Sequence, residues 1–508
     1  MNITYLGHAG FVIEAGSTRI LVDPWFYPAF LDSWFPAPDN RFLLEEVADL
    51  RFDLVFVSHG HEDHFDRTFL DRVARDTPVL CAKYLSRGLL SSWRALGFSD
   101  ITLVDHGDSI TVAPGVVATV LCDTSHREDS ALMLDVDGFT FLDLNDCLVQ
   151  FGELPAGVDI LTRQFSGAMW YPNCYRYPPD VLARKVSTVR RNLLQTLVTT
   201  CAATTPRWYL PSAGPACFLD PELQQFNDRN ATIFPAWEDV ADGFAAACPS
   251  VDVLRPMPGD RIEVRGGVPR LVERNDPARA TDTDLASYSA ARVNEYSALR
   301  NLSKPPVTSD ELRAHLVEHQ RKSKPLLEDC NKRVRISTEQ RAWTFTLRAE
   351  PEIELIESAP DPQSENPPAE YSFEMPEWVL REIVERDSWE EALLSMRITL
   401  TRDPDEFDVR LLGFLRYGHM RPVVQRLVSD IKSSDETIER DGLRLQRFCP
   451  HSGEDLTHAI ICDGIVECPR HHWKWDAASG TCIEGGTLPL RVEPIERAGE
   501  EPHKEPVA

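Results

Sequence analysis

The run SHGHEDH at residues 58–64 decides which fold this 508-residue chain is expected to adopt. It directly follows the apolar residues 54–57, a pattern typical of a buried strand that ends in a loop. A His-x-His pair directs two imidazoles at one metal ion, and the Asp-His pair behind it can aim at a second ion next to the first. Such a run rarely arises by chance in an unrelated core. The sequence therefore predicts a metal site that contains His59, His61, Asp63 and His64.

Length and composition predict a large globular protein without a membrane span. A chain of 508 residues should form roughly two to four domains, and 43% hydrophobic residues supply sizeable cores. The formal net charge of −27 argues against nucleic-acid and membrane partners, because it repels phosphate backbones and anionic lipids. No apolar run is long enough to cross a bilayer, and the first residues lack the features of a secretory signal. A cytoplasmic location is expected, in keeping with cysteines that are mostly scattered singly.

The pattern of apolar residues divides the chain into three regions and a tail. Residues 1–270 alternate short strands with helices near 67–76, 83–96 and 180–200, which predicts sheets with helices packed outside. Residues 271–435 read as a charged helical stretch at 275–340, a Pro-rich acidic linker at 358–370 and an α+β segment with a helix that opens at Pro376. Residues 436–495 predict a small domain of short strands, and residues 496–508 a disordered tail.

Two Cys/His pairs near the C-terminus form the second chemical signal. They read CPH at 449–451 and CPRH at 468–471. A structural zinc site uses the same residue types, but zinc motifs usually pair Cys-x-x-Cys with His-x-His instead of placing one of each on both loops. The pattern resembles Rieske domains, in which two thiolates hold one iron of a [2Fe–2S] cluster and two imidazoles hold the other. Residues 473–489 resemble the loop that covers such a cluster. The resemblance implies the cluster ligands Cys449, His451, Cys468 and His471.

The N-terminal motif, with the opening run at residues 5–25, resembles the metallo-β-lactamase fold over about residues 1–270. In that fold a third histidine and a bridging carboxylate follow later strands. The resemblance implies His126 for the former and Asp146 for the latter, with Asp143 as the less favoured carboxylate. His8 lies where related sequences place a histidine near the pocket, and a hydrogen-bonding core histidine explains it equally well.

The last histidine of that family is missing, since Ala213 stands near its expected place. One metal position is then completed by histidines and Asp146, while the second, with Asp63 and His64, is poorer in ligands. This asymmetry disfavours ordinary two-zinc hydrolysis. A histidine and carboxylate set with open positions suits non-haem Fe(II) and O₂ instead.

Together the two signals resemble the CMP-N-acetylneuraminate hydroxylase family. Further similar runs lie at 165–175, 211–219, 375–408 and 468–476, although the Rieske domain here follows the β-lactamase-like domain instead of preceding it. The implied fold class is an α/β and β multidomain protein: a metallo-β-lactamase αββα sandwich, an α+β middle region and a small all-β Rieske domain.

The implied activity is that of a Rieske-dependent non-haem iron monooxygenase, a hydroxylase or N-oxygenase. Its substrates would be O₂ and a small polar metabolite, with a sugar nucleotide as one option, and its cofactors the cluster and one or two Fe(II) ions, with zinc as the other metal. A ferredoxin or cytochrome b5-like protein with a reductase would supply electrons. The alternative is a lactonase-like metallo-hydrolase with the Rieske domain as a redox sensor. A homo-oligomer is one way to bring the two centres together.

A histidine pair and an aromatic loop each allow two interpretations. His315 and His319 have the i, i+4 spacing of a metal pair, but their charged surroundings favour a solvated helix. The aromatic loop at 24–35 is either a substrate lid or the hydrophobic cover of the sandwich.

Overall fold

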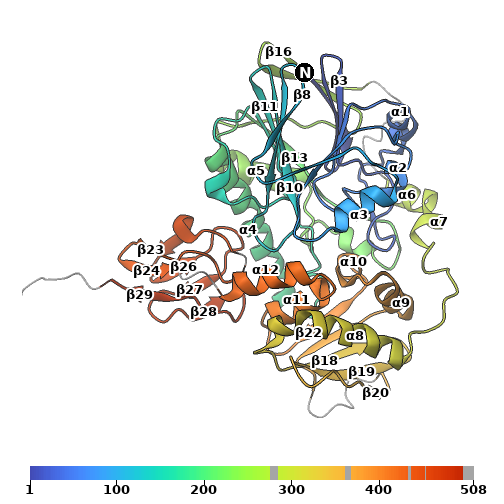
Figure 1. Cartoon of the computed structure of the whole chain (residues 1–508), viewed down its shortest axis with the longest axis vertical. Coiled ribbons are helices and arrows are strands. Elements are labelled where there is room, and N and C mark those ends of the chain that lie inside the picture. The colour runs from blue at the N-terminus through green and yellow to red at the C-terminus, as the bar shows by residue number, and fades with distance from the viewer. Residues whose placement is uncertain (275–283, 361–367, 433–435, 452, 496–508) are drawn as a thin grey trace, which may run out of the picture.

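The computed structural model describes residues 1–274, 284–360, 368–432, 436–451 and 453–495, and its N-terminal part is a sandwich of two sheets (Figure 1). The first sheet has the strand order β17-β16-β1-β2-β3-β5-β6-β7. Its strands are β1 (Asn2–Gly7), β2 (Gly10–Ala15), β3 (Thr18–Val22), β5 (Leu54–Phe56), β6 (Val79–Ala82), β7 (Ile101–Val104), β16 (Arg261–Arg265) and β17 (Val268–Val272).

The second sheet faces the first and has the order β15-β13-β12-β11-β10-β9-β8. Its strands are β8 (Ser109–Ala113), β9 (Val116–Cys122), β10 (Ser130–Val136), β11 (Phe139–Asp143), β12 (Ile160–Gln164), β13 (Trp208–Ser212) and β15 (Asp252–Val253). Buried apolar side chains of both sheets, such as Phe11 and Phe141, form the core between them. A two-stranded pair, β4 (Trp34–Phe35) with β14 (Cys217–Phe218), lies beside the sandwich.

Helices cover the outer face of each sheet. The first sheet packs against α1 (Leu44–Ala48), α2 (Arg67–Leu70) and α3 (Gly88–Ala95), and the second against α4 (Pro179–Thr204) and α5 (Trp237–Ala247). Proline at the start of α4 fits the first helical turn, where its missing N–H has no intrahelical partner. The predicted αββα sandwich is therefore confirmed, although α2 and α3 are shorter than the sequence suggested.

The middle region has a five-stranded sheet with the order β20-β19-β18-β21-β22. Its strands are β18 (Lys332–Ser337), β19 (Ala342–Leu347), β20 (Ile356–Ser358), β21 (Tyr371–Glu374) and β22 (Thr399–Arg402). Its helices are α6 (Leu285–Ala291), α7 (Val293–Tyr296), α8 (Ser309–Ser323), α9 (Glu377–Arg386), α10 (Trp389–Leu394), α11 (Val409–Tyr417) and α12 (Arg421–Lys432). The helical prediction for 275–340 was wrong at β18, a strand that pairs with β19 and β21 and whose last four residues are buried. Residues 275–283 and 361–367, part of the predicted linker, lie outside the described residues.

One apolar core joins the middle region to the sandwich. Trp25, Phe30 and Trp34 of the aromatic loop at 24–35 are buried together with side chains of the middle sheet. The Trp34 indole N–H donates to the carbonyl oxygen of Leu394 at 2.8 Å. The loop therefore serves as a hydrophobic cover that fixes the middle region against the sandwich.

The C-terminal domain projects from the side of the molecule next to α12 (Figure 1). It combines a three-stranded sheet, β23-β24-β29, with a four-stranded sheet, β25-β26-β27-β28. The strands are β23 (Thr437–Arg440), β24 (Leu443–Gln446), β25 (Ile460–Cys462), β26 (Ile465–Glu467), β27 (Lys474–Asp476), β28 (Cys482–Glu484) and β29 (Val492–Pro494). Val423 and Leu427 of α12 share its core with Cys449, Cys468 and Trp475. The predicted tail, residues 496–508, lies outside the described residues.

Candidate metal centres

Parallel strands bring the N-terminal candidate residues to one edge of the sandwich. β3 pairs in parallel with β5, and β11, β12 and β13 pair in parallel in the other sheet. The loops after these strands, which carry residues 58–64, Asp146 and Ala213, therefore emerge at corresponding ends of the two sheets. Ligand sites of α/β sheets form in that position.

Asp23, directly after β3, contacts the run at residues 58–64 and orients its side chains. Its carboxylate accepts the backbone N–H of Ser58 at 2.7 Å and lies 2.8 Å from Nδ1 of His64. A carboxylate behind a histidine fixes the ring so that the other nitrogen, Nε2, faces the metal. Sequence analysis missed Asp23, although an aspartate in the run LVDP at the end of a strand is a usable signal.

His59, His64 and Asp146 outline one metal position, and His61 lies beside His59. Nε2 of His59 lies 2.8 Å from Nδ1 of His61 and 3.9 Å from a carboxylate oxygen of Asp146. Burial lowers the pKa of His59 to about 3, so the ring is neutral at physiological pH and offers a lone pair to a metal ion.

His8, Asp63, His64 and Asp146 outline a second position. Nε2 of His8 lies 3.2 Å from Oδ2 of Asp63, and Nε2 of His64 lies 3.9 Å from that oxygen and 3.5 Å from Oδ1 of Asp146. Nε2 of His64, Oδ1 of Asp63 and Oδ1 of Asp146 are buried without a hydrogen-bond partner among the described residues. Buried polar atoms in a native fold normally have partners, so this donor set fits a metal ion.

His8 lies against the loop that lacks the family histidine. The backbone N–H of Ala213 donates to the carbonyl oxygen of His8 at 3.0 Å. His8 adds a third side chain to Asp63 and His64 at the second position. Residue 8 and residue 213 are adjacent only in the folded chain.

His126 does not join either cluster. Its Nδ1 lies 3.2 Å from Oδ2 of Asp430 on α12, and its ring contacts Tyr417. Asp129, three residues later, instead reaches the first position, with Oδ1 at 3.3 Å from Nδ1 of His59. Burial and the nearby Asp146 raise the pKa of Asp129 well above its usual range. The role of His126 as a ligand stays a prediction, and Asp129 is a further carboxylate at the site.

The middle region supplies a wall of the N-terminal site. Oε1 of Glu390, on α10, lies 3.5 Å from Nε2 of His61 and forms an ion pair with Arg416 of α11. Burial opposes the charged form of Glu390, but Arg416 outweighs it and the pKa of the carboxyl falls below its usual range. No local signal in the sequence connects Glu390 to a motif more than 300 residues away. The fold alone brings them together.

The C-terminal residues form a compact second centre. Cys449 and Cys468 are fully buried, and the rings of His451 and His471 lie 4.8 Å apart. Nδ1 of each histidine is buried and has no hydrogen-bond partner among the described residues. Burial lowers the pKa of both rings well below the usual value, so each is a neutral donor. Two thiols and two unpartnered imidazole nitrogens fit a Rieske cluster.

The two centres meet through the loop at 123–129. Arg127 donates to Nε2 of His471 at 3.2 Å. Arg470, beside it, is buried and pairs with Asp123 at 3.1 Å and with Glu454 at 2.5 Å. Arg470 also donates to the carbonyl oxygen of Leu148, in the loop that carries Asp146. The histidine side of the C-terminal centre therefore faces the N-terminal site within one chain.

The histidine pair on α8 is buried, so the expectation of a solvated helix was wrong. The Trp389 indole donates to Nε2 of His315 at 3.0 Å, and Nδ1 of His315 lies 3.3 Å from the Asp387 carboxylate. Nε2 of His319 lies 2.7 Å from the same carboxylate, and its Nδ1 faces the carbonyl oxygen of Phe414. Each of the four ring nitrogens has a polar partner, three through hydrogen bonds and Nδ1 of His315 through the Asp387 carboxylate, which explains this cluster without a metal ion.

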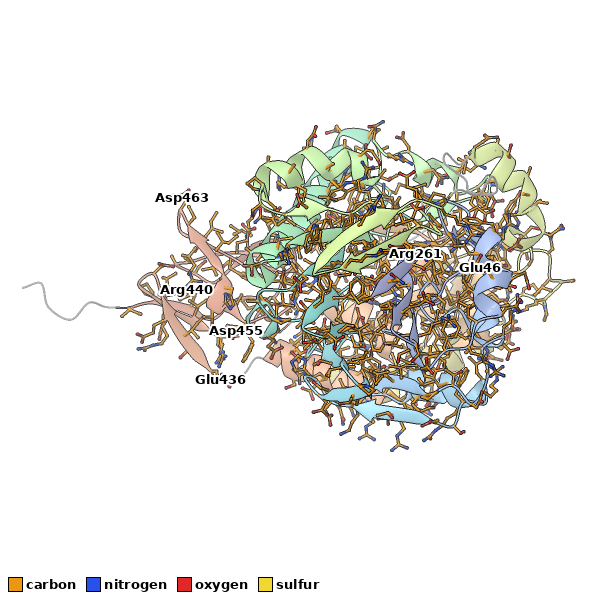
Figure 2. All side chains as sticks on the ribbon, turned by 90° about the horizontal axis from the view of Figure 1, so that it is seen from above. Glu46, Arg261, Glu436, Arg440, Asp455 and Asp463 are labelled. Carbon is orange, nitrogen blue, oxygen red and sulfur yellow. The ribbon has the colours of Figure 1, made fainter. Side chains whose placement is uncertain are left out.

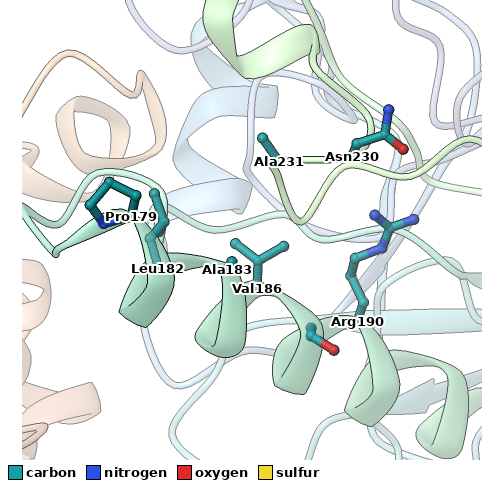
Figure 3. Close-up of a pocket in the computed structure, with 8 residues that line it drawn as sticks. Pro179, Leu182, Ala183, Val186, Arg190, Asn230 and Ala231 are labelled. Carbon is teal, nitrogen blue, oxygen red and sulfur yellow. The ribbon is translucent and has the colours of Figure 1, made fainter.

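A surface groove of about 480 Å³ lies along α4, away from both centres (Figure 3). Pro179, Leu182 and Val186 form its floor, and Arg190 with the loop at 230–231 closes one end. None of the candidate ligands lines it. The groove is therefore separate from the chemistry of the metal centres.

Comparison with known proteins agrees with the division of the chain into an N-terminal sandwich and a small C-terminal domain. The β-lactamase superfamily domain matches residues 2–145, and the Rieske [2Fe–2S] domain matches residues 437–491. A Rieske 2Fe-2S iron-sulfur protein of Mycolicibacterium smegmatis is 27% identical, over 97% of this chain and 100% of its own. The cytidine monophosphate-N-acetylneuraminic acid hydroxylase of Danio rerio is 25% identical, over 52% of this chain and 46% of its own. The structure of Igni18, a metallo hydrolase of Ignicoccus hospitalis, has a TM-score of 0.35 and 18% identity, over 52% of this chain and 99% of its own.

The chain thus combines a β-lactamase superfamily domain with a C-terminal Rieske [2Fe–2S] domain. The predicted fold class, the resemblance and the iron–sulfur cofactor are confirmed. No helix among the described residues has the length and apolar character needed to cross a membrane.

Proposed function

We propose that the protein is an iron-dependent monooxygenase, a hydroxylase or N-oxygenase, whose C-terminal cluster supplies electrons to iron at the N-terminal site. When bound, the cluster would pass single electrons and the N-terminal iron would activate O₂. One oxygen atom enters the substrate and the other leaves as water, so each turnover consumes two electrons and two protons.

The contact between Arg127 and His471 carries this proposal. Arg127 holds a cluster ligand at 3.2 Å and belongs to the same loop as Asp129, which lies 3.3 Å from His59. A short stretch of backbone thus connects a ligand of one centre to a ligand of the other. Hydrolysis needs no such connection, because it moves no electrons.

Buried ion pairs hold this arrangement in place. Asp123 and Glu454 neutralise Arg470, whose side chain is only 2% exposed. Breaking a buried pair of this kind leaves an uncompensated charge, which costs about 3–5 kcal/mol. The two centres are therefore held at one distance, as repeated electron delivery requires.

The ligand set of the N-terminal site supports iron. It combines histidines with the carboxylates of Asp63, Asp129 and Asp146, and non-haem iron is bound by such mixed sets with open positions. Glu390 accepts from His61, which would keep the other ring nitrogen directed at the metal.

We infer a small polar metabolite as the substrate, since Arg416, His61 and Glu390 place charged groups at the site. The chain spans less than half the length of the sialic acid hydroxylase from Danio rerio, so a sugar nucleotide is one member of this class and not the assigned substrate. A one-electron donor protein with its reductase completes the system.

The proposal is tested on full-length protein prepared without oxygen and supplied with ferrous iron and sulfide. Reduced protein should show a Rieske electron paramagnetic resonance (EPR) signal, hold iron at the N-terminal site, and consume O₂ only when a reductant is present. Protein that retains only zinc at that site, or that consumes no O₂ with reductant, would contradict the proposal.

A metallo-hydrolase is the second candidate, and His8 is the observation that favours it. With His8, the second position has the ligands for a second metal ion, as two-metal hydrolysis requires. In that case the zinc-loaded protein should cleave lactone or phosphodiester probes at the same rate with the cluster oxidised, reduced or removed. Loss of turnover without reductant excludes it.

A further inference from the structure

The two histidines of the C-terminal centre face different surroundings. His471 lies against Arg127 of the N-terminal domain. His451 stacks on Trp473, with ring centroids 4.2 Å apart and planes within 8° of parallel. If electrons leave through His471 toward the N-terminal site, the His451 side is free to receive them.

Aromatic side chains extend from His451 to the surface. The ring of Phe407 lies 5.6 Å from the ring of His451 and 6.1 Å from that of Trp473. Phe407 is half-buried and precedes α11, and it pairs with Gly486 in an isolated β-bridge. His451 is itself only partly buried, and Phe407 adds a half-buried ring beside it at the surface.

Two glycines bring the surface close to Trp473 at the same place. A Cβ atom at Gly485 or Gly486 would lie within 2.5 Å of the Trp473 ring. Only glycine lets the backbone of this loop lie directly on the indole, and Gly485 also has a positive φ of 117°. A protein that touches this loop is separated from Trp473 by one layer of backbone.

The chemistry of the surrounding surface is apolar at the centre and acidic at the edge. Ile483, two residues before the glycine loop, is 53% exposed. Glu406, directly before Phe407, and Asp403, four residues before Phe407 in the sequence, are exposed, and the charge of Glu406 acts on Cys482 at the base of the glycine loop. An apolar centre with a charged rim is typical of transient protein interfaces.

We propose that Phe407, Ile483 and the Gly485–Gly486 loop, with the rim carboxylates Asp403 and Glu406, form the docking surface for a one-electron carrier protein with a basic face. The acidic rim and the net charge of −27 attract such a partner and repel an acidic one. In each encounter the carrier loses one electron and the cluster gains one. This proposal rests on the proposed function, because it assumes the cluster.

Horse ferricytochrome c serves as the probe, since it is a basic one-electron protein whose reduction is read from its absorbance. The holoprotein is reduced by one electron at the cluster, and the second-order rate of electron transfer to ferricytochrome c is measured in a stopped-flow instrument. The same rate with ferricyanide, a small anion, reports the accessibility of the cluster without a protein interface.

The test compares three variants. Asp403→Asn/Glu406→Gln removes two negative charges at the rim, and Glu436→Gln/Asp463→Asn removes two charges elsewhere near the C-terminal domain (Figure 2). Phe407→Leu keeps an apolar side chain but removes the ring. Midpoint potential and the EPR spectrum of the reduced cluster are recorded for each, so that a damaged cluster is recognised.

We expect the rim variant to slow the reaction with ferricytochrome c by about threefold or more at low ionic strength, with the difference vanishing at high salt. The control pair should change the rate little. Phe407→Leu should slow the reaction further, with potential and spectrum unchanged.

Equal rates for the rim variant and the control, or an unchanged rate in Phe407→Leu, would overturn the docking surface. If the wild type lacks a Rieske signal, the proposed function fails first, so the two failures are distinguishable. A wild type that dimerises through this face, with the variants monomeric, would identify a second copy as the occupant and also contradict the proposal.

Discussion

The two metal centres of this chain are built in opposite ways. The four predicted ligands of the C-terminal centre lie between residues 449 and 471, on two loops of one small domain. The side chains of the N-terminal centre come from residues 8, 23, 59–64, 129, 146 and 390. These residues belong to both sheets of the sandwich and to the middle region. The first depends on local sequence, while the second depends on the whole fold.

This difference has a chemical consequence. A centre on two short loops can stay intact as long as its own small domain folds. A centre assembled from distant segments responds to every interface around it, including α10 and the loop at 123–129. The following changes test that contrast, beginning with the largest expected effect.

His471→Ala should abolish the Rieske signal completely, since the iron loses a ligand that no neighbour can replace. Metal at the N-terminal site should remain, as measured by metal analysis of the same sample. His472→Asn is the matched control, because His472 faces Glu467 at 2.7 Å and is not a predicted ligand. A signal that survives His471→Ala unchanged would contradict the ligand assignment.

Arg470→Met should destabilise the C-terminal domain by about 3–5 kcal/mol, because Asp123 and Glu454 would stay buried without a partner. Urea denaturation followed through cluster absorbance measures the loss. Arg444→Met, which removes an exposed pair with Glu439, should change stability by less than about 1 kcal/mol. Equal effects would mean that Arg470 does not hold the domains together.

His8→Ala should weaken binding of the second N-terminal metal ion by about tenfold or more, with the first ion retained. Titration of apoprotein with ferrous iron under nitrogen separates the two steps. His126→Ala provides the comparison, because its ring faces Asp430. Weaker binding in His126→Ala than in His8→Ala would show that the sequence-based assignment was the better one.

Glu390→Gln should produce the smallest effect, a loss of about tenfold in metal affinity, since it removes only the carboxylate behind His61. The control is Glu385→Gln on the neighbouring α9, where the carboxylate pairs with Lys304. The same titration should detect no change in the control. An unchanged affinity in Glu390→Gln would leave the middle region without a role in the metal site.

The sequence alone predicted the parts of the molecule that are encoded locally. The run at 58–64 and the pairs at 449–451 and 468–471 indicated the correct domains, because spacing within a loop determines where such side chains point. Neither Asp129 nor Glu390 stands in a recognisable motif, and only the packed fold brings them to His59 and His61.

Two sequence-based expectations rested on local sequence alone. The charged flanks of His315 and His319 suggested solvent exposure, yet α9, α10 and α11 cover that face of α8. The gap at Ala213 suggested a missing ligand, but His8 lies against it from another strand end. The periodicity of a local stretch of sequence does not predict contacts between distant segments.

EPR power saturation of the reduced cluster tests the proposed electron relay between the two centres, because it reports whether the centres of one chain lie close together. Protein is prepared with ferrous iron or with zinc at the N-terminal site, and both samples carry the reduced cluster. An electron relay within one chain predicts that the iron-loaded sample saturates at clearly higher microwave power, since a nearby fast-relaxing iron shortens the relaxation time of the cluster. Identical saturation in the two samples would contradict the electron relay.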